Sequence, residues 1–398
     1  MFYLEFFLVL VSLSIIEISV NRKHPLLRVM QTAVMIAFIF VAGLRYETGV
    51  DWLAYEWAFD RMMPLDEALR TDNLSKVFST LDVGFSFLSS SVRMIGGNIQ
   101  VLFFIISLIS NILLLKNLRH YVKYVFLGYA VYYIFFFFIF DLSGMRQGLA
   151  IQIFFYGLRF IERGNFKKYL ITILIATSIH WSSALLLPLY FIIRKPVSGK
   201  IAFAIFLIGT LLFALQVKWL STLTGGLSDQ LQSFSLLADK VNAYTTISNF
   251  AKNRSFDLFT LYNYVLIVLV YIGSGIILKD KKDKYVIIFR NLLICQFIIT
   301  FLLYEFYEIS ERLKFYFLIS VVFLIPTVVS SFSFRFYRQV AIAFFIVFIT
   351  FNSYTYLFAV YSTVAYQPYQ NLFLMWYQNK KGDGYDRLKK HMKINEAK

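Results

Sequence analysis

Long apolar runs alternate with short polar segments along the chain. A helix needs roughly 20 apolar residues to cross the hydrocarbon core of a bilayer, and most of these runs come close to that length. The pattern therefore predicts an all-α polytopic membrane protein with about 11–12 transmembrane helices. The apolar runs lie near 2–20, 28–44, 98–115, 122–140, 147–161, 168–193, 201–217, 258–278, 285–303, 313–331 and 337–358.

Two segments do not fit the pattern of a single membrane-spanning helix. Segment 168–193 carries basic residues at both ends, which predicts a broken or re-entrant hairpin that turns near 178–183. Segment 83–97 is too short and too polar to cross a bilayer, so we expect an interfacial or re-entrant helix there.

Composition agrees with the membrane interpretation. Of the 398 residues, 59% are apolar and 16% charged, which excludes an ordinary soluble domain. The net charge of +16 comes from Lys and Arg in the short segments between apolar runs, so it marks cytoplasmic loops and not a nucleic-acid partner. The single cysteine, Cys295, excludes a disulfide framework and a Cys-rich metal site.

If the basic loops are cytoplasmic, the remaining polar segments lie on the opposite face of the membrane. We expect one integral membrane domain, 1–398, in which loops 45–82 and 218–257 are periplasmic. The tail 379–398 is ambiguous, because its basic composition favours the cytoplasm whereas the count of crossings places it outside.

The first polar cluster combines Arg45, Gly49, Asp51 and Tyr55 directly after an apolar run. A cation, a flexible glycine and a carboxylate beside aromatic rings suit a phosphorylated sugar ligand. The structural alternative makes Arg45 an anchor at the membrane interface and Asp51 a helix N-cap.

The second cluster, Asp141 to Gln147, forms a tight turn between two apolar helices. Arg146 opens the second helix, where a cation opposes the positive end of the helix dipole unless an anion binds there. The alternative is an Asp141–Arg146 ion pair that closes the hairpin.

Two further ionisable positions stand out. His180 is the one histidine of four within an apolar run, and it is either functional or a hydrogen-bonded core residue. Arg312 opens another helix on the predicted outer face, with three nearby glutamates that could neutralise it. The sequence has no group of residues at the spacing of zinc ligands, and it has no nucleotide-binding loop. We therefore expect neither a metal nor another cofactor.

In their order and spacing these motifs resemble the EpsG-type branch of the Wzy polysaccharide repeat-unit polymerases. The resemblance implies a bacterial inner-membrane glycosyltransferase with the fold of multi-spanning lipid-donor enzymes. It would join oligosaccharides carried on undecaprenyl pyrophosphate, at the periplasmic face, into O-antigen, capsule or exopolysaccharide, with a chain-length regulator as a candidate partner. The motifs are Arg45 to Tyr55, Arg146 to Ala150, Arg163 to Tyr169, Ala176 to Ser183 and Arg312 to Phe317. Asp82 and Gly84 do not form a clear motif by themselves and are left outside the predicted site.

Chemistry then suggests a role for each group. Breaking a glycosyl–pyrophosphate bond releases roughly two to three negative charges, which arginines can stabilise. The acceptor hydroxyl needs a base, for which His180 is slightly preferred over Asp51. We therefore predict His180, Asp51 and Arg146 as catalytic. The predicted substrate-binding residues are Arg45, Gly49, Tyr55, Asp141, Gln147 and Arg312.

Two other functions use the same lipid-linked oligosaccharide. A flippase or exporter would also have about 12 spans, but transporters commonly show two related halves. The two halves differ here, and the polar clusters are predicted on one face. An O-antigen ligase shares the donor, and only the family resemblance separates it from a polymerase.

Overall fold

The structure is a computed structural model, which describes residues 2–20, 24–78, 82–219, 258–280, 283–305, 307–358 and 364–396. Within these ranges the regular elements are helices, apart from one isolated bridge between Arg45 and Asn371. The predicted loop 218–257 lies almost wholly outside the described residues. The predicted all-α class is confirmed.

Among the described residues, six helical stretches are long and apolar enough to cross a membrane. They are α1 (Phe2–Ser19), α2 (Pro25–Gly43), α7 (Ile99–Tyr121), Thr260–Ile277 within α15 (Leu258–Asp280), α16 (Lys284–Leu302), and Ser310–Ser331, which covers most of α17 (Tyr307–Leu318) and α18 (Ser320–Ser331). Shorter apolar helices are Val125–Asp141, Trp181–Ile192, α12 (Gly199–Ala214) and Phe336–Val347 within α19 (Arg335–Phe358). These lengths and compositions confirm a polytopic membrane protein.

The chain forms two compact units, Met1–Tyr190 with Ile325–Lys398, and Phe191–Leu324. In the second unit, Asn291 donates its side-chain amide to the carbonyls of Ile193 and Lys195, at 2.9 and 2.7 Å. The rings of Phe206 and Phe297 pack with centroids 4.3 Å apart. Integration of the whole chain into one membrane domain stays a prediction.

The first unit has an aromatic interior. Phe38 of α2 packs against Tyr129 of α8 (Val125–Tyr132) and against Phe137 of the following π-helical segment, Tyr133–Asp141. Gly43 allows α2 and α7 to approach closely, because a Cβ there would lie 3.0 Å from Phe104 Cα. The wide π turns end in the tight turn before α9 (Met145–Glu162).

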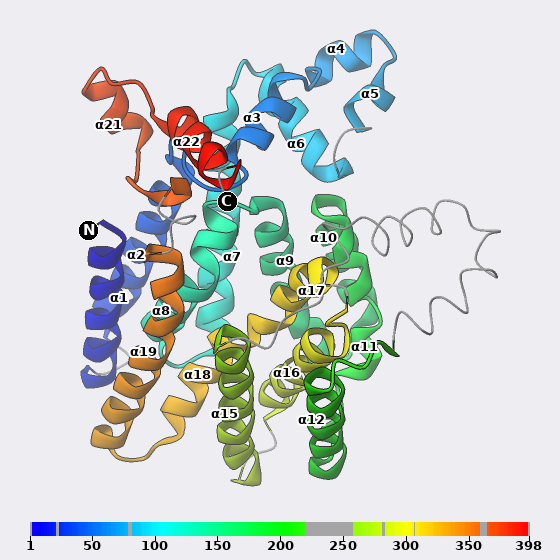
Figure 1. The fold of residues 1–398 in the computed structure, drawn as a ribbon, viewed down its shortest axis with the longest axis vertical. Coiled ribbons are helices and arrows are strands. Elements are labelled where there is room, and N and C mark those ends of the chain that lie inside the picture. The colour runs from blue at the N-terminus through cyan, green and yellow to red at the C-terminus, as the bar shows by residue number, and fades with distance from the viewer. Residues whose placement is uncertain are drawn as a thin grey trace, which may run out of the picture. The chain divides into compact units, whose positions relative to one another are not determined.

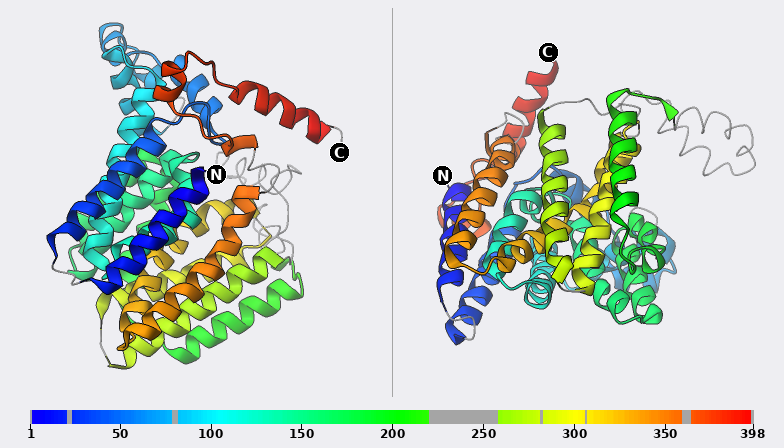
Figure 2. Two further views of the ribbon diagram at one scale, coloured as in Figure 1. Left: turned by 90° about the vertical axis from the view of Figure 1, so that its left-hand side faces the viewer. Right: turned by 90° about the horizontal axis from the view of Figure 1, so that it is seen from below.

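One end of this unit carries most of the short helices (Figure 1). They are α3 (Trp52–Asp60), α4 (Leu65–Arg70), α5 (Leu74–Phe78), α6 (Val83–Met94), α21 (Leu372–Tyr377) and α22 (Gly384–Glu396). The left view of Figure 2 shows the same grouping from another side. With 12 residues, α6 confirms that segment 83–97 holds a helix too short to span.

The basic tail is attached to the first predicted periplasmic loop. The N–H of Gly384 donates to Glu47 Oε2 at 2.7 Å, and Arg387 donates to the Glu47 carbonyl at 2.9 Å. The Tyr385 ring packs edge-on against Trp52, with centroids 5.0 Å apart. Loop and tail therefore lie at the same end of the unit.

The predicted break in segment 168–193 is confirmed. Helix α10 (Phe166–Ile179) stops at His180, whose backbone is extended, and a 3₁₀ helix follows over Trp181–Leu186. The Tyr169 hydroxyl, one turn into α10, donates to the Leu186 carbonyl at 2.7 Å. The chain has thus turned back along α10 as a hairpin with His180 at its turn.

Candidate active site

Three distant segments meet at the carboxylate of Asp82. Arg146 Nη1 donates to Asp82 Oδ2 at 3.1 Å, and the Trp181 N–H donates to Oδ1 at 3.1 Å. His180 Nδ1 lies 3.6 Å from Oδ2, within ion-pair range and slightly beyond an ordinary hydrogen bond. A cation, an imidazole and a carboxylate therefore share one location.

Local structure explains how each group reaches this point. Asp82 directly precedes α6, yet its carboxylate makes no capping hydrogen bond to that helix. Arg146 lies in the first turn of α9, where a nearby carboxylate offsets the unfavourable helix dipole. The break at the end of α10 presents both His180 and the Trp181 N–H to Asp82.

Gly84 brings α6 against the His180 turn. A Cβ at this position would lie 2.5 Å from Ser178 Oγ, closer than real side chains approach, and 3.0 Å from Ser178 Cβ. Glycine is therefore required two residues after Asp82 for the two segments to meet. The predicted site does not include Asp82 and Gly84, whereas the structure places Asp82 in contact with Arg146 and beside His180.

Electrostatics keep Asp82 ionised. Burial opposes ionisation, but the interactions with His180, the Trp181 N–H and Arg146 outweigh it and hold the pKa of Asp82 below its ordinary value. The three side chains are mostly buried but still reach solvent, with 11% of Asp82, 15% of His180 and 27% of Arg146 exposed. A substrate can therefore touch this cluster.

Aromatic rings form one wall of the cluster. The Arg146 guanidinium carbon lies 5.7 Å from the ring centroid of Tyr55 and 5.6 Å from that of Phe85. Tyr55, a predicted binding residue, is buried on α3, and burial raises its pKa despite the neighbouring Arg146. Asp51, one turn earlier, occupies the N-cap position of α3, but its side chain makes no capping hydrogen bond.

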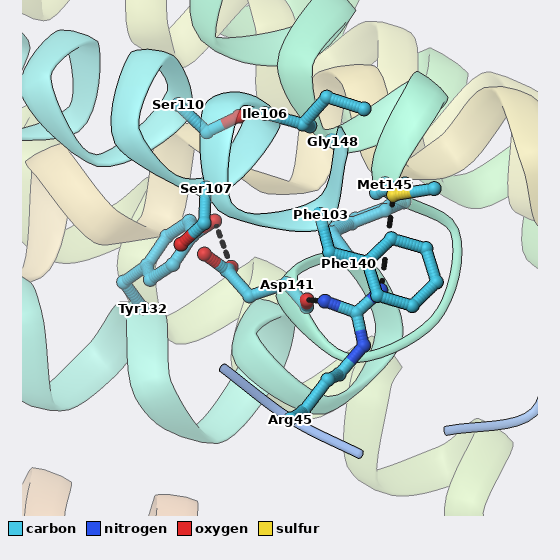
Figure 3. Close-up of a pocket in the computed structure, with 10 residues that line it drawn as sticks. All are labelled: Arg45, Phe103, Ile106, Ser107, Ser110, Tyr132, Phe140, Asp141, Met145 and Gly148. Carbon is cyan, nitrogen blue, oxygen red and sulfur yellow. Dashed lines mark hydrogen bonds between the residues drawn. The ribbon is translucent and has the colours of Figure 1, made fainter. Parts of the chain in front are cut away.

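Arg45 and Asp141 form a separate, internal cluster (Figure 3). The Arg45 side chain is 1% exposed, and its Nη1 donates to the carbonyls of Ala42 and Asp141 at 2.7 and 2.9 Å. Its guanidinium carbon lies 4.1 Å from the centre of the Phe103 ring. Burial lowers the pKa of Arg45 to about 10, which leaves it charged at neutral pH.

Asp141 is satisfied by neutral donors. Its Oδ2 accepts from the Tyr132 hydroxyl at 2.6 Å, and its Oδ1 accepts from the Asn111 amide at 3.1 Å. The space between these groups and Arg45 is about 10 Å³, which suits a single water molecule. The alternative Asp141–Arg146 ion pair is wrong, because Arg146 pairs with Asp82 instead.

Gly49 connects the Arg45 loop to the turn that precedes Arg146. Its φ is +111°, and a Cβ would lie 1.8 Å from the Leu142 carbonyl oxygen, so no other residue is accommodated. The next residue, Val50, donates its N–H to Ser143 Oγ at 2.9 Å.

Gln147 is half-buried beside Arg146, while Arg312 is exposed on α17 in the other unit.

Of the predicted site residues, the structure brings Arg146, His180 and Tyr55 together and places Arg45 and Asp141 in the neighbouring buried cluster. The residue that sequence reasoning missed is Asp82. An ionisable side chain two residues before a glycine, in a chain so rich in apolar residues, was the available signal. Among the described residues, no group of three or more His, Cys, Asp or Glu side chains is arranged to hold a metal ion.

These features define a polytopic membrane protein with a charged, partly accessible site at one end of a helical unit. Residues 28–371 match the EpsG family, and the chain therefore belongs to this family of Wzy-type polymerases. Membership indicates a polysaccharide polymerase with glycosyltransferase-like activity. No curated protein and no solved structure matches the chain.

Proposed function

We propose that this protein joins oligosaccharide repeat units, carried on undecaprenyl pyrophosphate, into a surface polysaccharide at the periplasmic face of the bacterial inner membrane. The observation that carries the proposal is the meeting of Arg146, His180 and Asp82 in one partly accessible cluster of an EpsG-family chain. Transfer from such a donor needs an anion-stabilising group and a base, and the cluster offers both.

Arg146 is the group that receives the pyrophosphate. Asp82 contacts one terminal nitrogen of its guanidinium, and a phosphate oxygen can bind elsewhere on the same planar group. The N-terminal end of α9 adds a favourable dipole for an anion. Charge that develops on the leaving group is then stabilised without a metal ion being needed at this contact.

His180 accepts the proton of the acceptor hydroxyl. Asp82 lies beside its Nδ1, so it orients the ring and stabilises the imidazolium that forms during transfer. Asp82 is thus a positioning residue, whereas His180 and Arg146 touch the reacting groups. Asp51 is the alternative base, since it lies one turn before Tyr55 at the edge of the cluster.

The remaining predicted residues support this arrangement. Arg45, Asp141 and Gly49 hold the turn that leads into Arg146 through internal contacts. We assign Gln147, beside Arg146, to sugar binding. Arg312, on the other unit, stays a predicted substrate-binding residue. A chain-length regulator and the surrounding bilayer are the proposed partners.

The product distribution tests this function. Purified full-length protein in liposomes is supplied with one defined lipid-linked repeat unit, and the glycans are separated by length. A polymerase gives a ladder in which each step adds one repeat unit. Translocation without new glycosidic bonds would assign the protein to the flippases, and transfer only to a lipid A core acceptor would make it a ligase.

A further inference from the structure

The second unit contains an apolar groove whose residues are not part of the candidate active site. Its volume is about 400 Å³, and it lies between α12 and α15, which both pack against α16 (Figure 1). Phe297 of α16 packs against both walls, with its ring centroid 4.3 Å from that of Phe206 on α12 and 5.9 Å from that of Tyr264 on α15. Apart from the hydroxyls of Thr210, Tyr264 and Tyr271, the side chains that line the groove are apolar.

Contacts across the groove show how its two walls run. The Thr210 hydroxyl oxygen lies 3.3 Å from that of Tyr264. The ring of Phe206, one turn earlier on α12, packs 5.4 Å from that of Tyr271, two turns later on α15. The two helices are therefore antiparallel. One end of the groove lies at the start of α12, next to the segment 194–200 that is predicted to be cytoplasmic.

The segment that leads into α12 lies at the same level of α16 as Arg290. Asn291 donates its side-chain amide to the carbonyls of Ile193 and Lys195, at 2.9 and 2.7 Å. Arg290 is the adjacent residue of α16. It precedes Phe297 by two helical turns, so it lies on the same face of the helix, at the end of the groove. We expect this level to be the cytoplasmic boundary of the bilayer, because the segment that leads into α12 is basic.

The side chain of Arg290 lies against the α15 wall of the groove. Its guanidinium carbon is 4.2 Å from the ring centre of Tyr271, which lines the groove. Its Nη2 lies beside Gly275, one turn beyond Tyr271, where a Cβ would be only 3.1 Å from that nitrogen. The glycine therefore leaves room for the guanidinium at this end of the groove.

The charge of Arg290 has no anionic partner in the part of the chain that the structure describes. No carboxylate there lies within ion-pair distance of it, and its buried Nε makes no hydrogen bond. An arginine inside an apolar segment is costly unless it is paired or binds a ligand, and stacking on Tyr271 offsets only part of that cost. A bound anion would complete the compensation.

We propose that this groove binds an anionic phospholipid of the cytoplasmic leaflet, with one acyl chain between α12 and α15 and the phosphate on Arg290. The apolar lining matches a hydrocarbon chain, and a phosphate at the end of the groove supplies the negative charge that Arg290 lacks. The candidate active site contributes no residue to this groove, so lipid binding is measured without any assay of glycan synthesis.

The test measures lipid binding to the purified full-length protein by native mass spectrometry, with phosphatidylglycerol titrated against phosphatidylcholine of the same acyl length. Arg290→Gln is expected to weaken phosphatidylglycerol binding by about five-fold and to leave phosphatidylcholine binding unchanged. Arg290→Lys keeps the charge and should retain most of the preference. Arg163→Gln is the matched control, since Arg163 is exposed in another predicted cytoplasmic segment, and it should bind both lipids as wild type does.

A second pair of variants tests the groove without changing Arg290. Leu207→Trp places a large ring in the lining, and Leu211→Trp makes the same change one turn later on α12, outside the groove; the two leucines are 47% and 50% exposed. Leu207→Trp should weaken phosphatidylglycerol binding, whereas Leu211→Trp should not.

Three results would overturn the proposal. The first is equal binding of the two lipids to wild type, and the second is unchanged phosphatidylglycerol binding in Arg290→Gln or in Leu207→Trp. The third is displacement of the lipid by millimolar inorganic phosphate, which would assign the site to a soluble anion. A wild-type dimer that Leu207→Trp dissociates would also contradict it, by assigning the groove to a second copy of the chain.

Discussion

At the scale of single residues, the two proposed reacting groups depend on a third side chain. Asp82 pairs with Arg146 and lies beside His180, so it sets the position of both. Its lowered pKa means that ionised Asp82 stabilises the folded state above the ordinary aspartate pKa, near 4. That contribution is lost as the pH falls through the lowered pKa.

We therefore predict that Asp82→Asn unfolds at a lower temperature than wild type at neutral pH and turns over about 10²-fold more slowly. The difference in unfolding temperature should persist at mildly acidic pH and shrink only below about pH 4. Thermal unfolding in detergent across this range checks the stability part. A difference that already vanishes near pH 6 would show that the Asp82 charge does not stabilise the fold.

The base can be identified from pH–rate profiles on one defined lipid-linked unit. If His180 accepts the proton, wild-type activity falls on the acid side of the profile, because a protonated ring cannot accept another proton. His180→Gln should then be slow and lack this acid limb. Near wild-type turnover of His180→Gln together with an inactive Asp51→Asn would instead identify Asp51 as the base.

Sequence reasoning found Arg146 and His180 because an ionisable group within or beside an apolar run is unusual enough to be noticed alone. Asp82 was missed because Asp82 and Gly84 form no clear motif by themselves. Its partners Arg146 and His180 lie 64 and 98 positions away in the sequence. The sequence predicts Arg45 as a ligand contact, and in the structure its Nη1 donates to two main-chain carbonyls. Which of several arginines is buried depends on tertiary packing that no local pattern records.

At the scale of elements, the close contact between α6 and the His180 turn is the critical one. Gly84→Ala should force the two apart, because its Cβ would overlap Ser178. We expect a loss of stability of about 1–3 kcal/mol and reduced turnover. Ser178→Ala, which removes the nearest atom, should partly restore both in the double variant.

Gly199→Ala is the matched control, since a Cβ at Gly199 meets no atom within 4 Å. Thermal unfolding and the glycan ladder measure both effects. A Gly84→Ala protein with wild-type stability and turnover would mean that α6 can shift without disturbing the site. The hairpin itself was predictable. Basic residues at both ends of an apolar run favour the cytoplasmic face for both ends, which a single crossing cannot provide, so the chain is expected to turn back.

At the scale of the whole molecule, the tail helix α22 is hydrogen-bonded to the loop that precedes α3. Composition alone could not place this tail. Its seven Lys and Arg residues favour the cytoplasm, whereas its hydrogen bonds to the Glu47 loop depend on tertiary packing. The division into two units was likewise not predicted, since apolar runs of similar character occur in both.

Topology is checked with single cysteines in a Cys295→Ala background. Cysteines at Glu67 and Lys389, exposed on the loop and the tail helix, should both react with a membrane-impermeant thiol reagent in intact spheroplasts. A cysteine at Lys116, in a predicted cytoplasmic segment, should react only after permeabilisation. Reaction at Glu67 but not at Lys389 would contradict the shared face.

If the Asp82–Arg146–His180 cluster carries out glycan polymerisation, the Arg146→Ala variant must lose this activity. Wild type and the control Arg61→Ala, which changes an exposed arginine at the end of α3, should give a glycan ladder when reconstituted with a defined lipid-linked repeat unit. Arg146→Ala, inserted at equal abundance, should give none, and Arg146→Lys should be poor because a point charge does not replace the planar fork. A full ladder from Arg146→Ala would contradict the account.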